Sequence, residues 1–238
     1  NHFESINCFQ KAIDFDPDTS IAYWGISYCF GPHYNRMEMC KDDYNNANKY
    51  FNLAFEKKSL GFNWEQGLID ALKYRYSDPM PIEGKEFHNH LVNFSMKMKE
   101  LYEQFPDDLD ITGIYTESVM NLRPWQLWTH DGKPYPEAIE AKIVLEKALN
   151  NGAPHPLIYH LYIHLLELSP FMREALPIAD GLLEMTKGIG HLLHMPSHIY
   201  IQVGQYKKAT ESNLRAIEAD NVVLKRIGVD NYYSFYKF

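Results

Sequence analysis

A pair of histidines recurs in this chain after 34 positions, and this spacing limits the folds that the chain can adopt. His160 and His164 are repeated as His194 and His198. Within each pair the two residues stand four apart, the spacing that places side chains on one face of a helix. Repeated helical units stack on their neighbours, so equivalent positions lie side by side. The spacing therefore predicts stacked helices on which two rows of histidines face one groove.

Each row gains a third side chain at helical spacing. On a helix that turns by about 100° per residue, Glu167 falls within roughly 60° of the first histidine pair. His191 falls within roughly 60° of the second pair on its own helix. Two triplets of potential ligands on stacked helices have the arrangement of a metal site.

Helical periodicity extends along almost the whole chain. No segment shows a sustained alternation of apolar and polar residues, so strands are not expected. Turn-forming pairs such as Asn151-Gly152 separate the segments. We expect helices over residues 1–15, 21–28, 43–57, 63–76, 85–104, 108–122, 136–150, 156–168, 172–186, 192–203 and 206–220. The predicted fold is an all-α solenoid of about five to seven antiparallel helix pairs, with no sheet and a single domain over residues 1–238.

The last helix pair carries a recognisable pattern of small and aromatic residues. These residues occupy turn and helix-crossing positions, and they are Ser197, Tyr200, Gly204, Tyr206, Ala209 and Ala216. The pattern resembles the tetratricopeptide repeat, a unit of about 34 residues that forms a helix–turn–helix. This resemblance implies that both histidine rows lie on the first-helix face that lines the concave groove. The string His194-Met-Pro-Ser-His-Ile-Tyr200 is also similar to one in uncharacterised microbial repeat proteins, and that similarity implies no particular activity.

The composition excludes several classes of partner. The net charge is −8 and there is no block of lysine and arginine, which argues against nucleic acid and anionic membranes. No apolar run approaches the ~20 residues that span a bilayer. Cys8, Cys29 and Cys40 are too few and too scattered for a disulfide framework or a CxxC zinc site. The chain begins inside a helix without Met, so we expect a fragment of a longer protein, and the compartment cannot be inferred.

The histidine rows predict a transition-metal site. Neutral imidazole suits zinc, copper, nickel or iron(II), and a nearby carboxylate extends the choice toward iron or manganese. Glu167 is expected to be a ligand or the general base. The expected ligands are His160, His164, His191, His194 and His198. Five imidazoles exceed the four ligands of a closed zinc site, so either two ions bind or some histidines contact ligands or substrate.

Two functions follow from this pattern. The first is a metal-dependent enzyme, a hydrolase or an oxidoreductase, in which an open coordination position activates water or dioxygen. The alternative is a non-catalytic scaffold that binds a peptide or a small molecule in the concave groove, the commoner role of helical repeats. A histidine-rich face favours the metal site, because scaffold grooves usually carry lysine, arginine and asparagine.

Other candidate residues carry weaker signals. Glu117 lies in the middle of an expected helix, where a buried carboxylate needs a partner and a solvated one does not. Trp24, Tyr28, His33 and Asn35 could extend the same groove or simply pack between repeats. The segment 123–136 is long and aromatic, so we expect a packed loop that covers a site or fills a gap.

Overall fold

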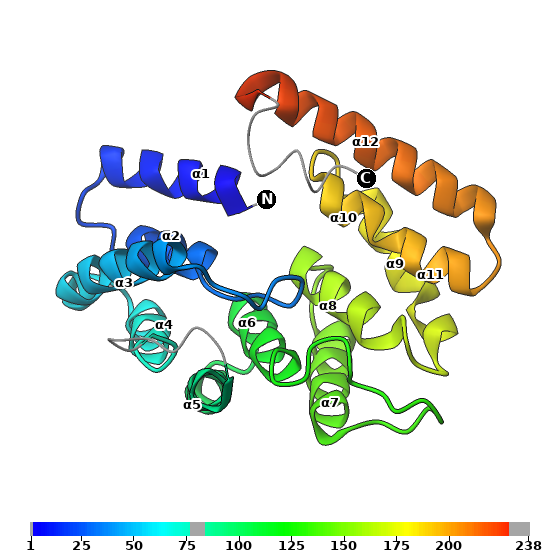
Figure 1. Ribbon diagram of the computed structural model, residues 1–238, viewed down its shortest axis with the longest axis horizontal. Helices are drawn as coiled ribbons and strands as arrows, with labels where there is room; N and C mark the ends of the chain where they lie inside the picture. The colour runs from blue at the N-terminus through cyan, green and yellow to red at the C-terminus, as the bar shows by residue number, and fades with distance from the viewer. Residues whose placement is uncertain (1, 77–83, 229–238) are drawn as a thin grey trace. The chain divides into compact units, whose positions relative to one another are not determined.

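The computed structural model describes residues 2–76 and 84–228, and over these residues the chain is all-helical (Figure 1). Pairing of extended backbone in these ranges is limited to two isolated bridges, His33 with Arg36 and Trp128 with Pro134. The prediction of an all-α fold without a sheet is confirmed for this part of the chain. Within the same ranges, every helix is too short or too polar to cross a membrane. The described part of the chain divides into two compact units, one within residues 2–125 and one within residues 126–228.

In the described residues 2–76 and 84–125, the first unit contains six α-helices and one short 3₁₀ helix. Their bounds are α1 (His2–Phe15), α2 (Ser20–Phe30), α3 (Lys41–Glu56), η1 (Lys58–Leu60), α4 (Asn63–Leu72), α5 (Gly84–Gln104) and α6 (Leu109–Met120). Helices α1 and α2 pack against each other, and at Gly25 the Phe9 ring occupies the space that a side chain would need. A glycine there allows two helix backbones to pack tightly, as small residues do at helix crossings.

The interior of this first unit also contains a polar cluster. Arg75 is 1% exposed, and its Cζ lies 4.5 Å from the centre of the Tyr28 ring and 5.0 Å from that of Phe94. The Tyr28 hydroxyl donates to Glu117 Oε2 at 2.7 Å. The Arg75 guanidinium donates to the backbone carbonyl of Pro32. Two aromatic faces thus lie against a buried positive charge and stabilise it.

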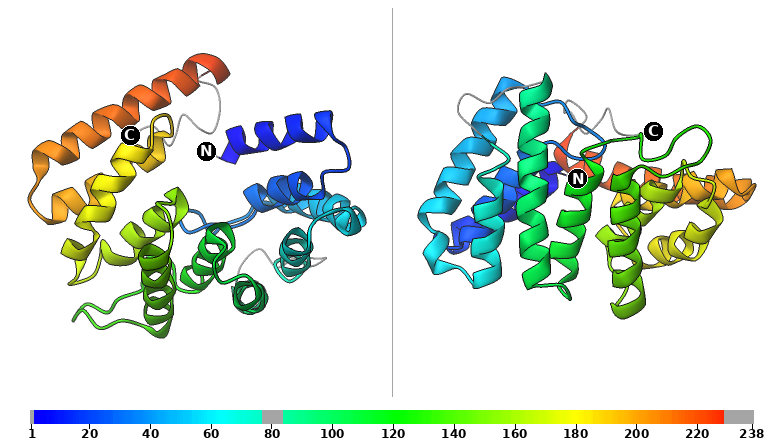
Figure 2. Two further views of the ribbon diagram at one scale, coloured as in Figure 1. Left: turned by 180° about the vertical axis from the view of Figure 1, so that it is seen from behind. Right: turned by 90° about the horizontal axis from the view of Figure 1, so that it is seen from below.

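The second unit contains six α-helices and one 3₁₀ helix over its described residues. Their bounds are α7 (Pro136–Asn151), α8 (Pro156–Leu166), η2 (Met172–Ala175), α9 (Leu176–Met185), α10 (Gly190–His194), α11 (Pro196–Gln202) and α12 (Tyr206–Ile227). Helix α8 packs against α7, α9 and α11, and α12 runs along α10 and α11 (Figures 1 and 2). Because α8 has neighbours on several sides, seven of its eleven residues are buried, most of them apolar.

Prolines divide two of the expected helices. Pro196 lacks an N–H, so the segment expected at 192–203 forms α10 and α11 with Met195 between them. Pro177 similarly stands at the start of α9, after η2. The aromatic segment 123–136 is a loop, as expected, and its Trp128 Nε1 donates to the Leu165 carbonyl at 2.7 Å. That hydrogen bond fastens the loop to the end of α8.

Candidate metal centre

Helices α8 and α10 of the second unit bring three histidine side chains together. His160 and His164 stand one turn apart on α8, and their ring centres are 4.6 Å apart. His191 comes from the first turn of α10, with its ring centre 5.0 Å from that of His160. Each of the three offers one ring nitrogen, and these nitrogens all lie within 4.8 Å of one another. Three histidines at this separation could hold a metal ion.

The three side chains differ in their access to water. His164 is 3% exposed, His160 is partly buried and His191 is exposed. A metal ion held here would therefore be anchored to the core through His164 and reached from solvent beside His191. This combination of a buried anchor and an open side is what a site with exchangeable ligands requires.

The two rows meet with an offset that differs from the expected one. His164 does lie near His198, with ring centres 6.1 Å apart. His160, however, meets His191 through the two Nε2 atoms at 3.0 Å, whereas equal register would place it beside His194. His191 precedes His194 by three residues, which is about 4.5 Å along a helix axis. The packed helices are therefore shifted by almost one turn from the register that the 34-residue repeat predicts.

Glu167 lies behind the imidazoles and touches both rows. It follows the last turn of α8 and is 4% exposed. Its Oε1 accepts a hydrogen bond from His164 Nδ1 at 2.7 Å, and its Oε2 accepts one from His198 Nδ1. A carboxylate that accepts from Nδ1 leaves the opposite nitrogen, Nε2, without a proton. Such carboxylate–histidine pairs orient metal ligands in many proteins.

The electrostatics of the cluster favour the charged form of Glu167 and the neutral forms of His191 and His194. Burial disfavours the Glu167 carboxylate, but the hydrogen bonds from His164 and His198 outweigh it and lower its pKa to about 2. Loss of hydration lowers the pKa of His191, and the positive charges that neighbouring imidazoles would carry lower it further. Neutral imidazole is the form that binds metal.

His194 and His198 form a second close pair. Their Nε2 atoms are 2.9 Å apart, and their ring centres are 4.8 Å apart. His194 Nδ1 donates to Asn213 Oδ1 at 2.7 Å. Asn213, on α12, was not a candidate from the sequence. Its position between Ala209 and Ala216 on the face that packs against α10 and α11 was the available signal.

The other sequence candidates lie in the first unit. Glu117 has its partner in the Tyr28 hydroxyl, and burial together with the Glu117 charge raises the pKa of Tyr28. Trp24 stacks on Tyr28 with ring centres 5.0 Å apart and donates to the Leu68 carbonyl at 3.1 Å. These contacts belong to the interior of the first unit and serve its packing.

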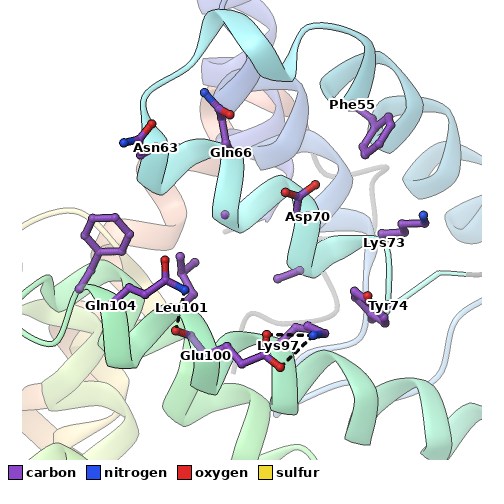
Figure 3. A pocket seen from close by; sticks show the side chains of 13 residues that line it. Phe55, Asn63, Gln66, Asp70, Lys73, Tyr74, Lys97, Glu100, Leu101 and Gln104 are labelled. Carbon is purple, nitrogen blue, oxygen red and sulfur yellow. Dashed lines mark hydrogen bonds and ion pairs between the residues drawn. The ribbon is translucent and has the colours of Figure 1, made fainter.

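A groove of about 640 Å³ lies elsewhere in the first unit, between α4 and α5 (Figure 3). Its polar lining residues include Asn63, Gln66 and Asp70 of α4 and Glu100 and Gln104 of α5. Apolar side chains such as Phe55 and Leu101 line it as well, and the lining carries both signs of charge.

Comparisons with known proteins add no assignment to this geometry. No protein-family model matches the chain, and no curated protein is significantly similar to it.

Proposed function

We propose that this chain is a metalloprotein whose primary ion is held by His160, His164 and His191. The observation that carries this proposal is the convergence of three imidazole nitrogens, from two helices, within 4.8 Å of one another. Catalytic zinc sites typically use three protein ligands and keep a fourth position for water or substrate. Three histidines with one exposed member match that pattern and favour zinc, copper or iron(II).

The same proposal extends to catalysis. An open coordination position next to His191 would let a bound metal activate water for hydrolysis or dioxygen for oxidation. Both reactions use histidine-rich ligand sets, so we propose a metal-dependent hydrolase or oxidoreductase. The scaffold is proposed to be a tetratricopeptide-like solenoid that forms a single domain. The burial of Ser197, Ala209 and Ala216 at helix crossings supports the repeat register.

Glu167 is proposed to orient ligands, in place of the role as ligand or general base that the sequence suggested. Both of its oxygens already accept hydrogen bonds from imidazole, and it is 4% exposed. Glu167→Gln leaves one acceptor oxygen for two donors, so metal affinity is expected to fall about 10- to 100-fold. A general base would instead give unchanged metal affinity and a loss confined to turnover.

Elemental analysis of the chain tests the primary proposal. Protein purified without chelator should carry close to one equivalent or more of a transition metal, and His164→Ala should remove most of it. His130→Ala is the matched control, because His130 is an exposed histidine of the same unit outside the cluster. Less than about 0.2 equivalents of any transition metal in the unaltered protein would contradict the proposal.

The second candidate function is a peptide-binding scaffold, which the groove between α4 and α5 favours. Amide side chains such as Gln66 and Gln104 can pair with the backbone of an extended peptide. This function predicts peptide binding that chelator leaves unchanged and that a Gln66→Ala, Gln104→Ala double variant abolishes. A library of extended peptides screened by fluorescence polarisation would measure it.

A further inference from the structure

The neighbours of the His194–His198 pair fix where the ring protons of the two histidines lie. His198 Nδ1 faces a carboxylate oxygen of Glu167, which can only accept. His194 Nδ1 faces the amide oxygen of Asn213 at 2.7 Å, which also accepts. Both Nδ1 atoms therefore carry the ring proton. A neutral imidazole has one ring N–H, so both Nε2 atoms are left with lone pairs.

The two Nε2 atoms that carry these lone pairs are 2.9 Å apart. While both rings are neutral, no hydrogen bond joins the two acceptors, and lone pairs at this distance repel. The repulsion is relieved when a proton is shared by the two nitrogens or when a metal cation lies beside the pair within reach of both. Two nitrogens that bind one ion at about 2.05 Å are about 2.9 Å apart at a right angle and about 3.3 Å apart at a tetrahedral angle. The observed separation thus fits two ligands of one ion.

Access and orientation agree with this interpretation. The His198 side chain is 26% exposed, so an ion can reach it from solvent. The carboxylate behind His198 and the amide behind His194 form the outer contacts that typically fix the tautomer of metal-binding histidines. The three-histidine site lies close by, since the His191 and His194 ring centres are 6.5 Å apart.

We propose that His194 and His198 hold a second metal ion beside the one held by His160, His164 and His191. This proposal rests on the proposed function and deepens it to a two-ion centre. Glu167 links the ions, because one oxygen orients His164 of the first site and the other orients His198 of the second. The second ion has two protein ligands, so most of its coordination positions are open to water or to oxygen atoms of a substrate. Paired ions that share a substrate oxygen are a common device of metal-dependent hydrolysis.

Zinc titration of the full chain, stripped by chelator, tests the second site separately from the first. At pH 7.5, where unperturbed histidine is largely neutral, calorimetry should show two Zn²⁺ ions binding in two steps, the tighter at the three-histidine site. The His194→Ala, His198→Ala double variant should bind one Zn²⁺ with the affinity of the tight step. Circular dichroism and thermal unfolding of the zinc-free variant confirm that it is folded, and His130→Ala is the matched control with two ions.

Three results would overturn the second site. If the unaltered chain binds one ion and the double variant binds it equally well, the pair shares a proton and the three-histidine site alone stands. If a folded double variant binds no ion, all five histidines serve one ion. If the unaltered chain binds no Zn²⁺, Co²⁺ or Cu²⁺, both the second site and the primary proposal are wrong.

Discussion

Each unit of this chain contains a cluster of polar side chains between packed helices, and the two clusters differ in their charges. In the first unit, the buried Arg75 charge lies against aromatic rings, and Tyr28 connects that region to the Glu117 carboxylate. Charges of both signs come from the chain itself. In the second unit, several imidazoles lie around the single carboxylate of Glu167, and the Nε2 atoms of His194 and His198 are 2.9 Å apart. The first cluster already contains its own cation, of which Arg75 Nη2 donates to the Pro32 carbonyl, whereas the second gains most from an added cation.

This difference separates a structural cluster from a functional one. A buried cation with its own acceptors and ring faces rigidifies the interior, and its removal should affect stability alone. A group of bases without a matching cation costs free energy in the ligand-free fold and recovers it on binding. Perturbed, closely grouped titratable residues are for that reason candidates for function.

The largest effect is expected from removal of the charge in the first cluster. Arg75→Ala deletes a fully buried side chain, leaves the Pro32 carbonyl without its donor and removes the contact with the Tyr28 ring. Unfolding free energy should fall by about 3 kcal/mol, measured by urea denaturation. The loss should be the same with and without chelator. If the loss of unfolding free energy changed when metal was removed, the stability of the first cluster would depend on metal binding at the second, which would contradict this prediction.

The next effect is stabilisation of the second cluster by metal. Zn²⁺ at 100 times its dissociation constant should raise the unfolding free energy by about 2.7 kcal/mol, because only the folded chain brings the ligands together. His164→Ala should abolish the increase. His88→Ala and His130→Ala alter exposed histidines outside the cluster and should retain it. Equal zinc stabilisation of His164→Ala and the unaltered chain would remove the contrast between the units.

The first unit should also lose stability at low pH, through His2. Burial lowers the pKa of His2 to about 4, and the nearby Arg75 charge adds to the shift. The unfolded chain takes up this proton near pH 6.5, so the neutral ring contributes stability above that value and loses it as the pH falls toward 4. The stability advantage of the unaltered chain over His2→Gln should shrink by about 2 kcal/mol between pH 7 and pH 4. Comparing the two proteins cancels the titration of the second cluster, and an advantage that is constant with pH would contradict the prediction.

The smallest effect is expected at Asn213. Asn213→Leu removes the acceptor that holds the His194 tautomer, so the weaker zinc step should lose about tenfold in affinity, or about 1.4 kcal/mol. The tight step should keep its affinity, because Asn213 touches neither His160 nor His164 in the contacts described. Calorimetric titration measures both steps. Equal weakening of the two would indicate a general loss of packing around α12.

Most of the helices could be predicted from the sequence, because each depends on neighbours within a few positions. The expected segment at 63–76 ended early, at Leu72, and prolines divided two others, since local hydrogen bonding stops where an N–H is missing. The same local geometry placed His160 and His164 on one face of α8. The tetratricopeptide register, the solenoid and the single domain stay predictions.

The sequence by itself determined which side chains share a helix face, since a period of 3.6 residues is set by the backbone alone. Only the tertiary structure decided which histidines meet. His160 faces His191 and not His194 because α8 and α10 pack with a shift of almost one turn. Tertiary packing also turned Glu167 toward two imidazoles and brought Asn213 of α12 to His194. Those contacts depend on how side chains from separate helices fill space together, and no spacing along the chain encodes that.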